Sequence, residues 1–206
     1  MTKRAEEGRI WEWRAFGRIN DRLAEKVRAY PIRLGIEDLR GEDLYLVSPL
    51  SDQNVKLRKY VRGWVLKFKL LLETRPGGFE LYKESSEFTY RMPVKLEELK
   101  AAARLLSVEL PENDLTDQLF EEPDFVNALA KSSPPAQETR VSKRRSQYQC
   151  GDGWIELADV VFETFEVQSV SVHSHQIDGV REMLKGLEPG DGLEAMNYIE
   201  ACRRWG

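Results

Sequence analysis

The chain of 206 residues is long enough for one substantial domain, and its 41% hydrophobic residues are enough for a large core. A formal net charge of -4 excludes a generally basic nucleic-acid coat, so an anion site would need a local concentration of cations. No apolar run approaches the roughly 20 residues of a membrane span. The N-terminus lacks the apolar core of a secretory signal, and Cys150 and Cys202 match no disulfide or metal-ligand framework, which indicates a reduced cytoplasmic protein.

The first two predicted elements are a strand over residues 9–16 and a helix over residues 20–29. The strand alternates in character, so Ile10, Glu12 and Arg14 should share one face. Its other face carries two tryptophans and an alanine and should pack against helices. The asparagine or aspartate at the first two helical positions can cap the helix, and the proline that follows ends it.

Four further strands and two helices are predicted in the middle of the chain. A Pro-Gly-Gly turn at residues 76–78 separates the third and fourth of these strands. Beyond Pro93 the leucines and alanines recur at a helical period. The strands cover residues 33–47, 55–61, 64–73 and 79–94, and the helices cover residues 95–108 and 117–131.

Three more strands and a helical tail complete the predicted fold, which is α+β: an eight-stranded antiparallel β-barrel with flanking helices. We expect a single domain over residues 1–206, with C-terminal helices from about 178 to 206. A closed barrel of this strand number has an interior that side chains or one ligand can occupy, so charged residues facing inward would mark a ligand tunnel. The last strands cover residues 138–149, 154–162 and 165–173, and the tail helices cover residues 178–185 and 197–205.

The most prominent pattern is a set of cation pairs whose members are two residues apart on predicted strands. Both members of such a pair point to the same face of a strand. Cations gathered on one sheet face repel one another unless an anion or interleaved carboxylates lie between them, and this arrangement suits a phosphate-rich ligand. The pairs are Lys56 and Arg58, Lys67 and Lys69, and Lys143 and Arg145.

These patterns also have plainer interpretations. The cation pairs could form a solvated sheet face that pairs with Glu80 and Glu84 on a neighbouring strand. Glu12 could make a salt bridge to a nearby arginine or lysine. His173 and His175 offer only two metal ligands, which favours surface or hydrogen-bonded histidines over a metal site.

The order of the strands, with the motifs VKLR, VLKFK, VSKRRSQY and GWIELADV followed by SVSVHS, resembles the triphosphate tunnel metalloenzyme superfamily, also called CYTH. The resemblance covers most of the chain, from about Arg9 to His173. It implies an antiparallel tunnel whose inner basic residues hold phosphates and whose inner glutamates hold a divalent metal. Many members hydrolyse inorganic triphosphate, thiamine triphosphate or RNA 5′-triphosphate ends, and some are adenylate cyclases.

The resemblance also implies roles for individual residues. The family's opening Glu-x-Glu-x-Lys motif falls on Ile10, Glu12 and Arg14, so the middle carboxylate is retained and arginine replaces lysine. Glu12 and Arg14 would be catalytic. Glu12, Glu80 and Glu156 could all face the tunnel, and we expect Glu12 with Glu156 to hold Mg²⁺ or Mn²⁺, although only Glu12 is placed by the family motif. The implied phosphate ligands are Lys56, Arg58, Lys67, Lys69, Lys143 and Arg145, the last followed by Tyr148.

One departure from the family pattern bears on function. The family's closing glutamate pair falls on Ser171 and His173, and neither is a carboxylate. The leading hypothesis is a phosphohydrolase that acts on a triphosphate or other phosphorylated small molecule through positioning and charge stabilisation. The alternative is a non-catalytic module of the same fold that holds an anionic ligand or an acidic partner. An RNA-end binder is a third hypothesis, although the acidic net charge disfavours nucleic acid.

Overall fold

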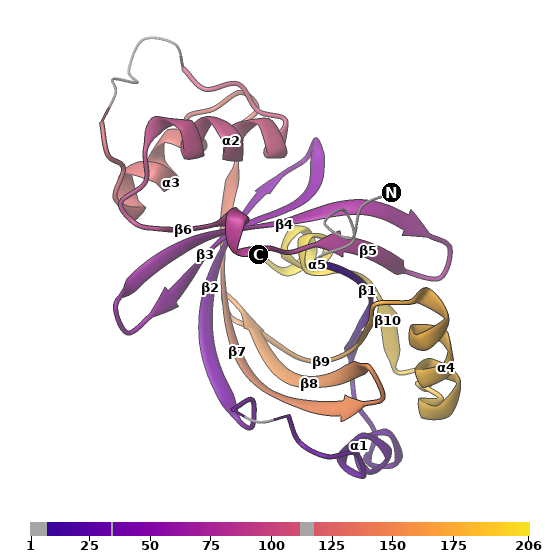
Figure 1. Cartoon of the computed structure of the whole chain (residues 1–206). Helices are drawn as coiled ribbons and strands as arrows, with labels where there is room; N and C mark the ends of the chain where they lie inside the picture. Colours follow the sequence, from indigo (N-terminus) through magenta and orange to yellow (C-terminus); the bar gives the residue numbers. More distant parts are fainter. Residues whose placement is uncertain (1–7, 34, 112–117) are drawn as a thin grey trace. The chain divides into compact units, whose positions relative to one another are not determined.

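Ten strands and five α-helices are assigned in the part of the chain that the computed structural model describes, residues 8–33, 35–111 and 118–206 (Figure 1). The strands are β1 (Arg9–Gly17), β2 (Leu39–Ser48), β3 (Ser51–Tyr60), β4 (Gly63–Arg75), β5 (Phe79–Lys83), β6 (Thr89–Arg91), β7 (Gln137–Cys150), β8 (Gly153–Phe162), β9 (Phe165–Ser174) and β10 (Leu193–Ala195). The helices are α1 (Asp21–Arg28), α2 (Leu96–Leu106), α3 (Glu122–Ala130), α4 (Ile177–Leu187) and α5 (Tyr198–Trp205).

Eight of these strands form an antiparallel sheet whose order closes on itself. The order is β1-β5-β4-β3-β2-β7-β8-β9, and β9 pairs again with β1. The short strands β10 and β6 lie outside this ring, where they pair with β1 and β4. The fold is therefore the predicted α+β class, an eight-stranded antiparallel β-barrel with flanking helices.

Two compact units divide the chain. The first unit comprises residues 1–40, 71–84 and 142–197, and the second comprises residues 41–70, 85–141 and 198–206. Strands β2, β4 and β7 contribute residues to both units.

In the first unit, helices α1 and α4 cover the apolar face of the sheet. Trp11 and Trp13 of β1 lie in one buried cluster with Leu23 of α1 and Val180 of α4. Helix α4 runs beside β1 and β10 in Figure 1. The side chain of Asn20 caps α1 by accepting a hydrogen bond from the Leu23 amide at 2.8 Å. The packing of the tryptophan face against helices is confirmed, and so is a cap from one of the two predicted positions.

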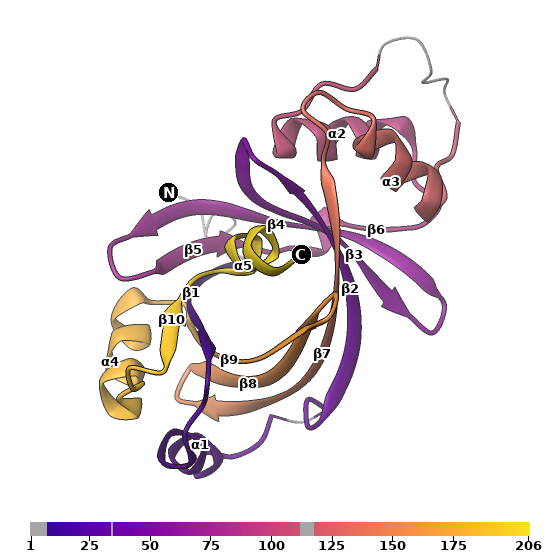
Figure 2. The ribbon, with the colours of Figure 1, turned by 180° about the vertical axis from the view of Figure 1, so that it is seen from behind.

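In the second unit, α2 and α3 cover the apolar face of β2, β3 and β4. Leu44, Leu57 and Leu66 of these strands are fully buried in one cluster with Leu99 of α2 and Phe125 of α3. The two helices lie together in both ribbon views (Figure 2). Since successive strand residues point to opposite faces, the cations that alternate with these leucines point away from the two helices.

Several predicted elements have other bounds. The strand predicted over 33–47 begins only at Leu39. The strand predicted over 79–94 is broken into β5, a short 3-10 helix at Ser86–Phe88 and β6. The break occurs because the hydroxyl of Ser85 accepts a hydrogen bond from the backbone amide of Glu87 and so caps a helical turn. The predicted start of a helix at residue 117 lies outside the described residues, and α3 begins at Glu122. The three-residue strand β10 was not predicted.

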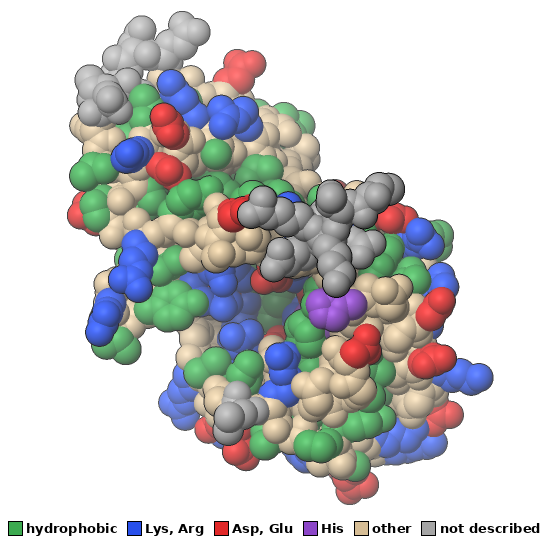
Figure 3. Space-filling model, in the orientation of Figure 1, with side chains coloured by type: hydrophobic (Ala, Val, Ile, Leu, Met, Phe, Trp, Pro, Cys, Tyr) green, Lys and Arg blue, Asp and Glu red, His purple; other side chains and the backbone are tan. Residues whose placement is uncertain are grey.

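The surface carries charges of both signs. Lysine and arginine side chains are interspersed with aspartate and glutamate on the face shown in Figure 3. Among the described residues, no helix combines the length and the apolar character needed to cross a membrane.

Candidate functional site

The sheet of the first unit has a second face that is buried and yet polar. Glu12 and Arg14 alternate with the two tryptophans of β1, so they point away from the helix-covered face. Strands β8 and β9 add Glu156, Ser171 and His173 to the same face, and each of the five side chains is at most 6% exposed. In the strand register, Arg14 is opposite Ser171, which is opposite Glu156, and Glu12 is opposite His173. Ionisable side chains that are buried so close together need hydrogen-bond or ion-pair partners.

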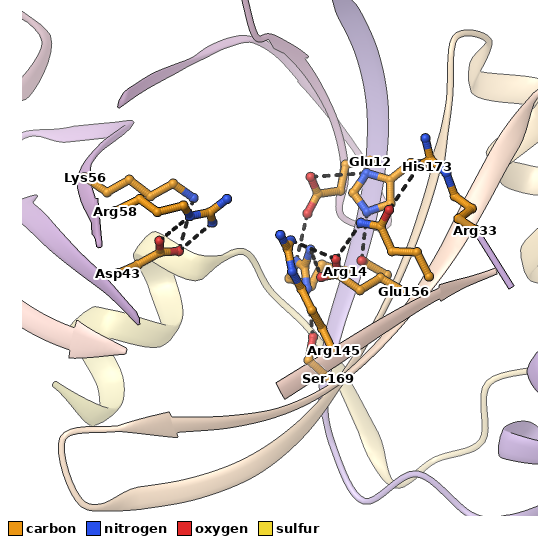
Figure 4. A network of polar contacts seen from close by, with 12 residues as sticks. Glu12, Arg14, Arg33, Asp43, Lys56, Arg58, Arg145, Glu156, Ser169 and His173 are labelled. Atoms are coloured by element: carbon orange, nitrogen blue, oxygen red, sulfur yellow. Dashed lines mark hydrogen bonds and ion pairs between the residues drawn. The ribbon is translucent and has the colours of Figure 1, made fainter. Parts of the chain in front are cut away.

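Arg14 contacts three polar side chains on this face, and each of them comes from a different strand (Figure 4). Its Nε donates to Oε1 of Glu12 at 2.8 Å, and its Nη1 donates to the Ser169 hydroxyl at 3.0 Å. Its Nη2 lies 3.4 Å from Oε1 of Glu156. A guanidinium has five N–H donors in a fixed planar arrangement, so one side chain can hold both carboxylates.

Glu156 is bound by donors on both of its oxygens. Its Oε2 accepts from Gln147 Nε2 at 2.8 Å and from Arg145 Nη1 at 3.2 Å, while Oε1 faces Arg14. Burial would by itself raise the pKa of this carboxyl. The charges of Arg14 and Arg145, together with His173 and the Gln147 hydrogen bond, outweigh burial and hold the pKa of Glu156 at about 2.

A stack of three side chains flanks the carboxylates. The ring of His173 lies parallel to the Trp154 ring, with centroids 4.6 Å apart, and the guanidinium of Arg33 lies 4.5 Å from the Trp154 centroid. Arg33 also donates to Oε1 of Gln147 at 3.1 Å, which connects the stack to Glu156 through the two ends of one amide. Nδ1 of His173 lies 3.6 Å from Oε2 of Glu12.

A further carboxylate, Glu80, lies opposite Glu12 on β5. Its Oε1 accepts from Nδ2 of Asn197 at 2.6 Å, and its Oε2 accepts from the Tyr82 hydroxyl at 2.7 Å. Burial, followed by the charges of Glu80 and Glu12, raises the pKa of the Tyr82 phenol well above its usual value, so it remains a neutral donor. An amide and a phenol thus bind the two oxygens of Glu80.

The second unit has its own cation cluster, which is built around Asp43 of β2. Arg58 donates to both oxygens of Asp43, from Nε at 2.6 Å and from Nη2 at 2.8 Å, and Nζ of Lys56 lies 3.5 Å from Oδ2. Lys56 also donates to the Tyr45 hydroxyl at 3.3 Å. Burial opposes the charge of Arg58, but Asp43 outweighs burial and raises the pKa of the guanidinium. Lys67 is directly opposite Lys56 on the neighbouring strand.

The predicted site residues therefore fall into two groups. The first unit brings together Glu12, Arg14, Arg145 and Glu156, and strand alternation places Lys143 on the face of Arg145. The second unit holds Lys56, Arg58, Lys67 and Lys69 on one face of β3 and β4. Tyr148 packs in the apolar cluster of α1 and α4.

Sequence reasoning missed four contributors: Arg33, Asp43, Gln147 and Ser169. Gln147 could have been found, because it continues the two-residue spacing of Lys143 and Arg145. Asp43 could not have been found from local patterns, because only the register of β2 against β3 places it opposite Arg58. Ser169 could have been found as well, because it opens the SVSVHS motif and shares a strand face with Ser171 and His173, whereas Arg33 lies in no pattern that points to the site.

The carboxylates present do not fit a divalent metal ion. Mg²⁺ and Mn²⁺ need several oxygen ligands on one centre, usually including carboxylates. Each oxygen of Glu80 and Glu156 has a protein donor, and Glu12 faces Arg14 and His173. Within the described residues, no group of three or more His, Cys, Asp or Glu side chains could hold a metal.

Comparison with known proteins shows which solved structures have a similar fold. No family model and no curated protein sequence matches the chain. A solved structure of a proposed adenylate cyclase from Bacillus halodurans is similar over 94% of this chain and 98% of that one, with a TM-score of 0.51 and 13% identity. A proposed adenylyl cyclase from Hippeastrum, with a dominant triphosphatase activity, covers 95% of both chains with a TM-score of 0.50 and 10% identity. The chain shares the fold of these two proteins. The predicted resemblance to CYTH proteins is thus confirmed at the level of the fold.

Proposed function

We propose that the protein binds a triphosphate or another phosphorylated small molecule through the cations of its buried polar face. The observation that carries this proposal concerns Arg145 and Arg33. Each guanidinium makes one side-chain hydrogen bond among the described residues, to Glu156 or to Gln147, and neither is fully buried. Their remaining N–H donors are available to an anion. Guanidinium groups bind phosphate oxygens in pairs of parallel hydrogen bonds, which suits a ligand with several phosphoryl groups.

The experiment that tests this proposal is a calorimetric titration of the purified chain with tripolyphosphate. We expect Arg145→Ala to weaken binding about 10- to 150-fold, the equivalent of one lost charge-assisted hydrogen bond. The fold should persist, because Arg14 and Gln147 still hold Glu156 in this variant.

The matched control is Arg144→Ala. Arg144 directly precedes Arg145 on the same strand. It is exposed and forms an ion pair with Asp38. This substitution removes the same charge from the opposite strand face, so affinity should change by less than about twofold if local contacts decide binding. Equal losses in both variants, or unchanged affinity in folded Arg145→Ala, would contradict the proposal.

Hydrolysis of the bound triphosphate is the second candidate function. The observation in its favour is the fold shared with the Hippeastrum protein that has triphosphatase activity. Under this hypothesis Glu12 and Arg14 act as catalytic residues, and an Mg²⁺ or Mn²⁺ ion at Glu12 and Glu156 would have to displace Arg14 from both carboxylates. Phosphate release measured during the same titration tests it: turnover with either metal supports an enzyme, and binding without turnover supports a binding module.

A further inference from the structure

The two carboxylates that we expected to hold a metal, Glu12 and Glu156, are bridged by a single protein cation. Arg14 Nε donates to Glu12 at 2.8 Å, and Nη2 of the same guanidinium faces Glu156 at 3.4 Å. The Ser169 hydroxyl accepts from Nη1 at 3.0 Å, which fixes the position of the third nitrogen. All four side chains are at most 6% exposed. Arg14 thus provides the positive charge that a bridging metal would otherwise supply.

The strand register explains how the guanidinium reaches both carboxylates. Ser171 lies between Arg14 on β1 and Glu156 on β8, because it is the register partner of both residues. Its side chain is small and turns to His173, whose Nε2 lies 2.8 Å from the serine hydroxyl. A carboxylate at residue 171 would add a third negative charge beside Glu156. The serine leaves room for the guanidinium and adds no charge.

We propose that Arg14 takes the electrostatic place of a divalent cation between Glu12 and Glu156, so that the protein binds its phosphate ligand without metal. The metal-free binding of a ligand rests on the proposed function, whereas the replacement of the metal by Arg14 does not.

The chemistry of arginine makes this replacement permanent. A guanidinium does not lose its proton in proteins, so the cation cannot be neutralised to admit a metal ion. A divalent ion next to Arg14 would be repelled by it and would compete with it for the same oxygens. Mg²⁺ also gives up its water ligands reluctantly, and it needs uncommitted carboxylates to do so. In contrast to a bound metal, Arg14 is retained in the presence of chelators.

The first test titrates the wild-type chain with tripolyphosphate in EDTA and then with excess Mg²⁺ or Mn²⁺. We expect full affinity in EDTA, and weaker apparent binding with metal, because the metal complexes the free ligand. Binding that appears only with metal would overturn the inference while leaving the proposed function intact. Absence of binding in every condition would contradict the proposed function and would leave the role of Arg14 to the second test.

The second test requires no phosphate ligand. Removing Arg14 leaves Glu12 and Glu156 without their shared cation, so Arg14→Ala should melt at a lower temperature and should gain affinity for Mn²⁺. We expect saturating Mn²⁺ to raise the melting temperature of this variant by about 5 °C or more, and that of wild type by less than about 1 °C. The control is the double variant Arg14→Ala/Glu156→Gln, which also lacks one carboxylate. In this variant Mn²⁺ should no longer raise the melting temperature.

Two results would overturn the role of Arg14. One is a wild-type melting temperature that Mn²⁺ raises as much as it raises that of Arg14→Ala. The other is a folded Arg14→Ala variant that does not respond to Mn²⁺. If Arg14→Ala does not fold, Arg14→Gln retains hydrogen-bond donors without the charge and takes its place. Mn²⁺ electron paramagnetic resonance of the wild-type chain gives an independent measurement, in which we expect the signal of free aqueous ion.

Discussion

At the scale of single residues, the buried polar face is stabilised by charges that are almost entirely paired within the protein. A buried charge without a partner costs several kcal/mol, so such a face is stable only if each carboxylate has a donor. Glu12 and Glu156 meet this condition through Arg14, and Glu156 also through Arg145 and Gln147. The same pairing that stabilises the carboxylates withdraws them from metal binding.

The low pKa of Glu156 predicts a defined loss of stability in acid. Its pKa is about 2 in the folded chain and 4.5 in an ordinary glutamate, so the unfolded state binds more protons between these values and stability falls as pH falls. We expect this carboxyl to account for on the order of 2 kcal/mol of unfolding free energy lost between pH 7 and pH 3. Urea unfolding across this range should show a smaller pH dependence in Glu156→Gln.

The control for this measurement is Glu166→Gln, which removes an exposed carboxylate from β9. Its pH dependence should match that of the wild type. A Glu156→Gln variant with the full wild-type acid dependence would show that other carboxylates carry the effect.

At the scale of elements, the β3–β4 hairpin contains a pair of like charges. Lys56 and Lys67 are direct partners in the strand register, and Asp43 reaches Lys56 at 3.5 Å. Among the described residues, Lys67 has no ion-pair partner, and it lies on the face that carries Arg58. Like charges directly opposite on a sheet are destabilising, so the hairpin has a cost that an anion would relieve.

Lys67→Gln should therefore have opposite effects on stability and on binding. We expect the free energy of unfolding without ligand to rise by roughly 0.2–1 kcal/mol, because the like-charge pair is removed. We also expect weaker tripolyphosphate binding in calorimetry. Lys59→Gln is the matched control, since Lys59 is exposed on the same hairpin and lies 3.6 Å from Glu42. Lower stability together with unchanged affinity in Lys67→Gln would identify Lys67 as a structural lysine.

The elements also show how far sequence patterns extend. The alternation in β1, β3 and β4 correctly predicted which residues share a face, because strand periodicity depends on the local chain alone. The break after β5 was missed, since one serine cap decides it and the surrounding residues continue to alternate. The hydrogen-bond partners of the side chains were predicted less well than the strand faces on which the side chains lie. Asp43 binds Arg58 only because the register of β2 against β3 places them opposite one another, and no local pattern fixes that register.

At the scale of the whole molecule, the fold was predictable and the state of its site was not. The positions of the strands and turns along the chain follow from local signals, and the resemblance to tunnel proteins indicated that the strands form a barrel. Whether Glu12 and Glu156 hold a metal or an arginine depends on three strands meeting in one register, with a serine at residue 171. The sequence showed that carboxylates were missing at Ser171 and His173, but it could not show that Arg14 bridges those that remain.

The net charge of -4 predicts that the protein binds a small phosphorylated ligand and not a long polyanion. An RNA backbone is a long polyanion, and an acidic protein repels it outside a local cation site. A 5′-hydroxyl RNA oligonucleotide should therefore show no detectable binding at physiological salt in fluorescence anisotropy. The same oligonucleotide with a 5′-triphosphate should bind, and tripolyphosphate should displace it, because only its end presents the phosphoryl chain that arginines recognise. Equal binding of both oligonucleotides would mean that the cations of this chain serve a nucleic-acid surface and not a small phosphorylated ligand.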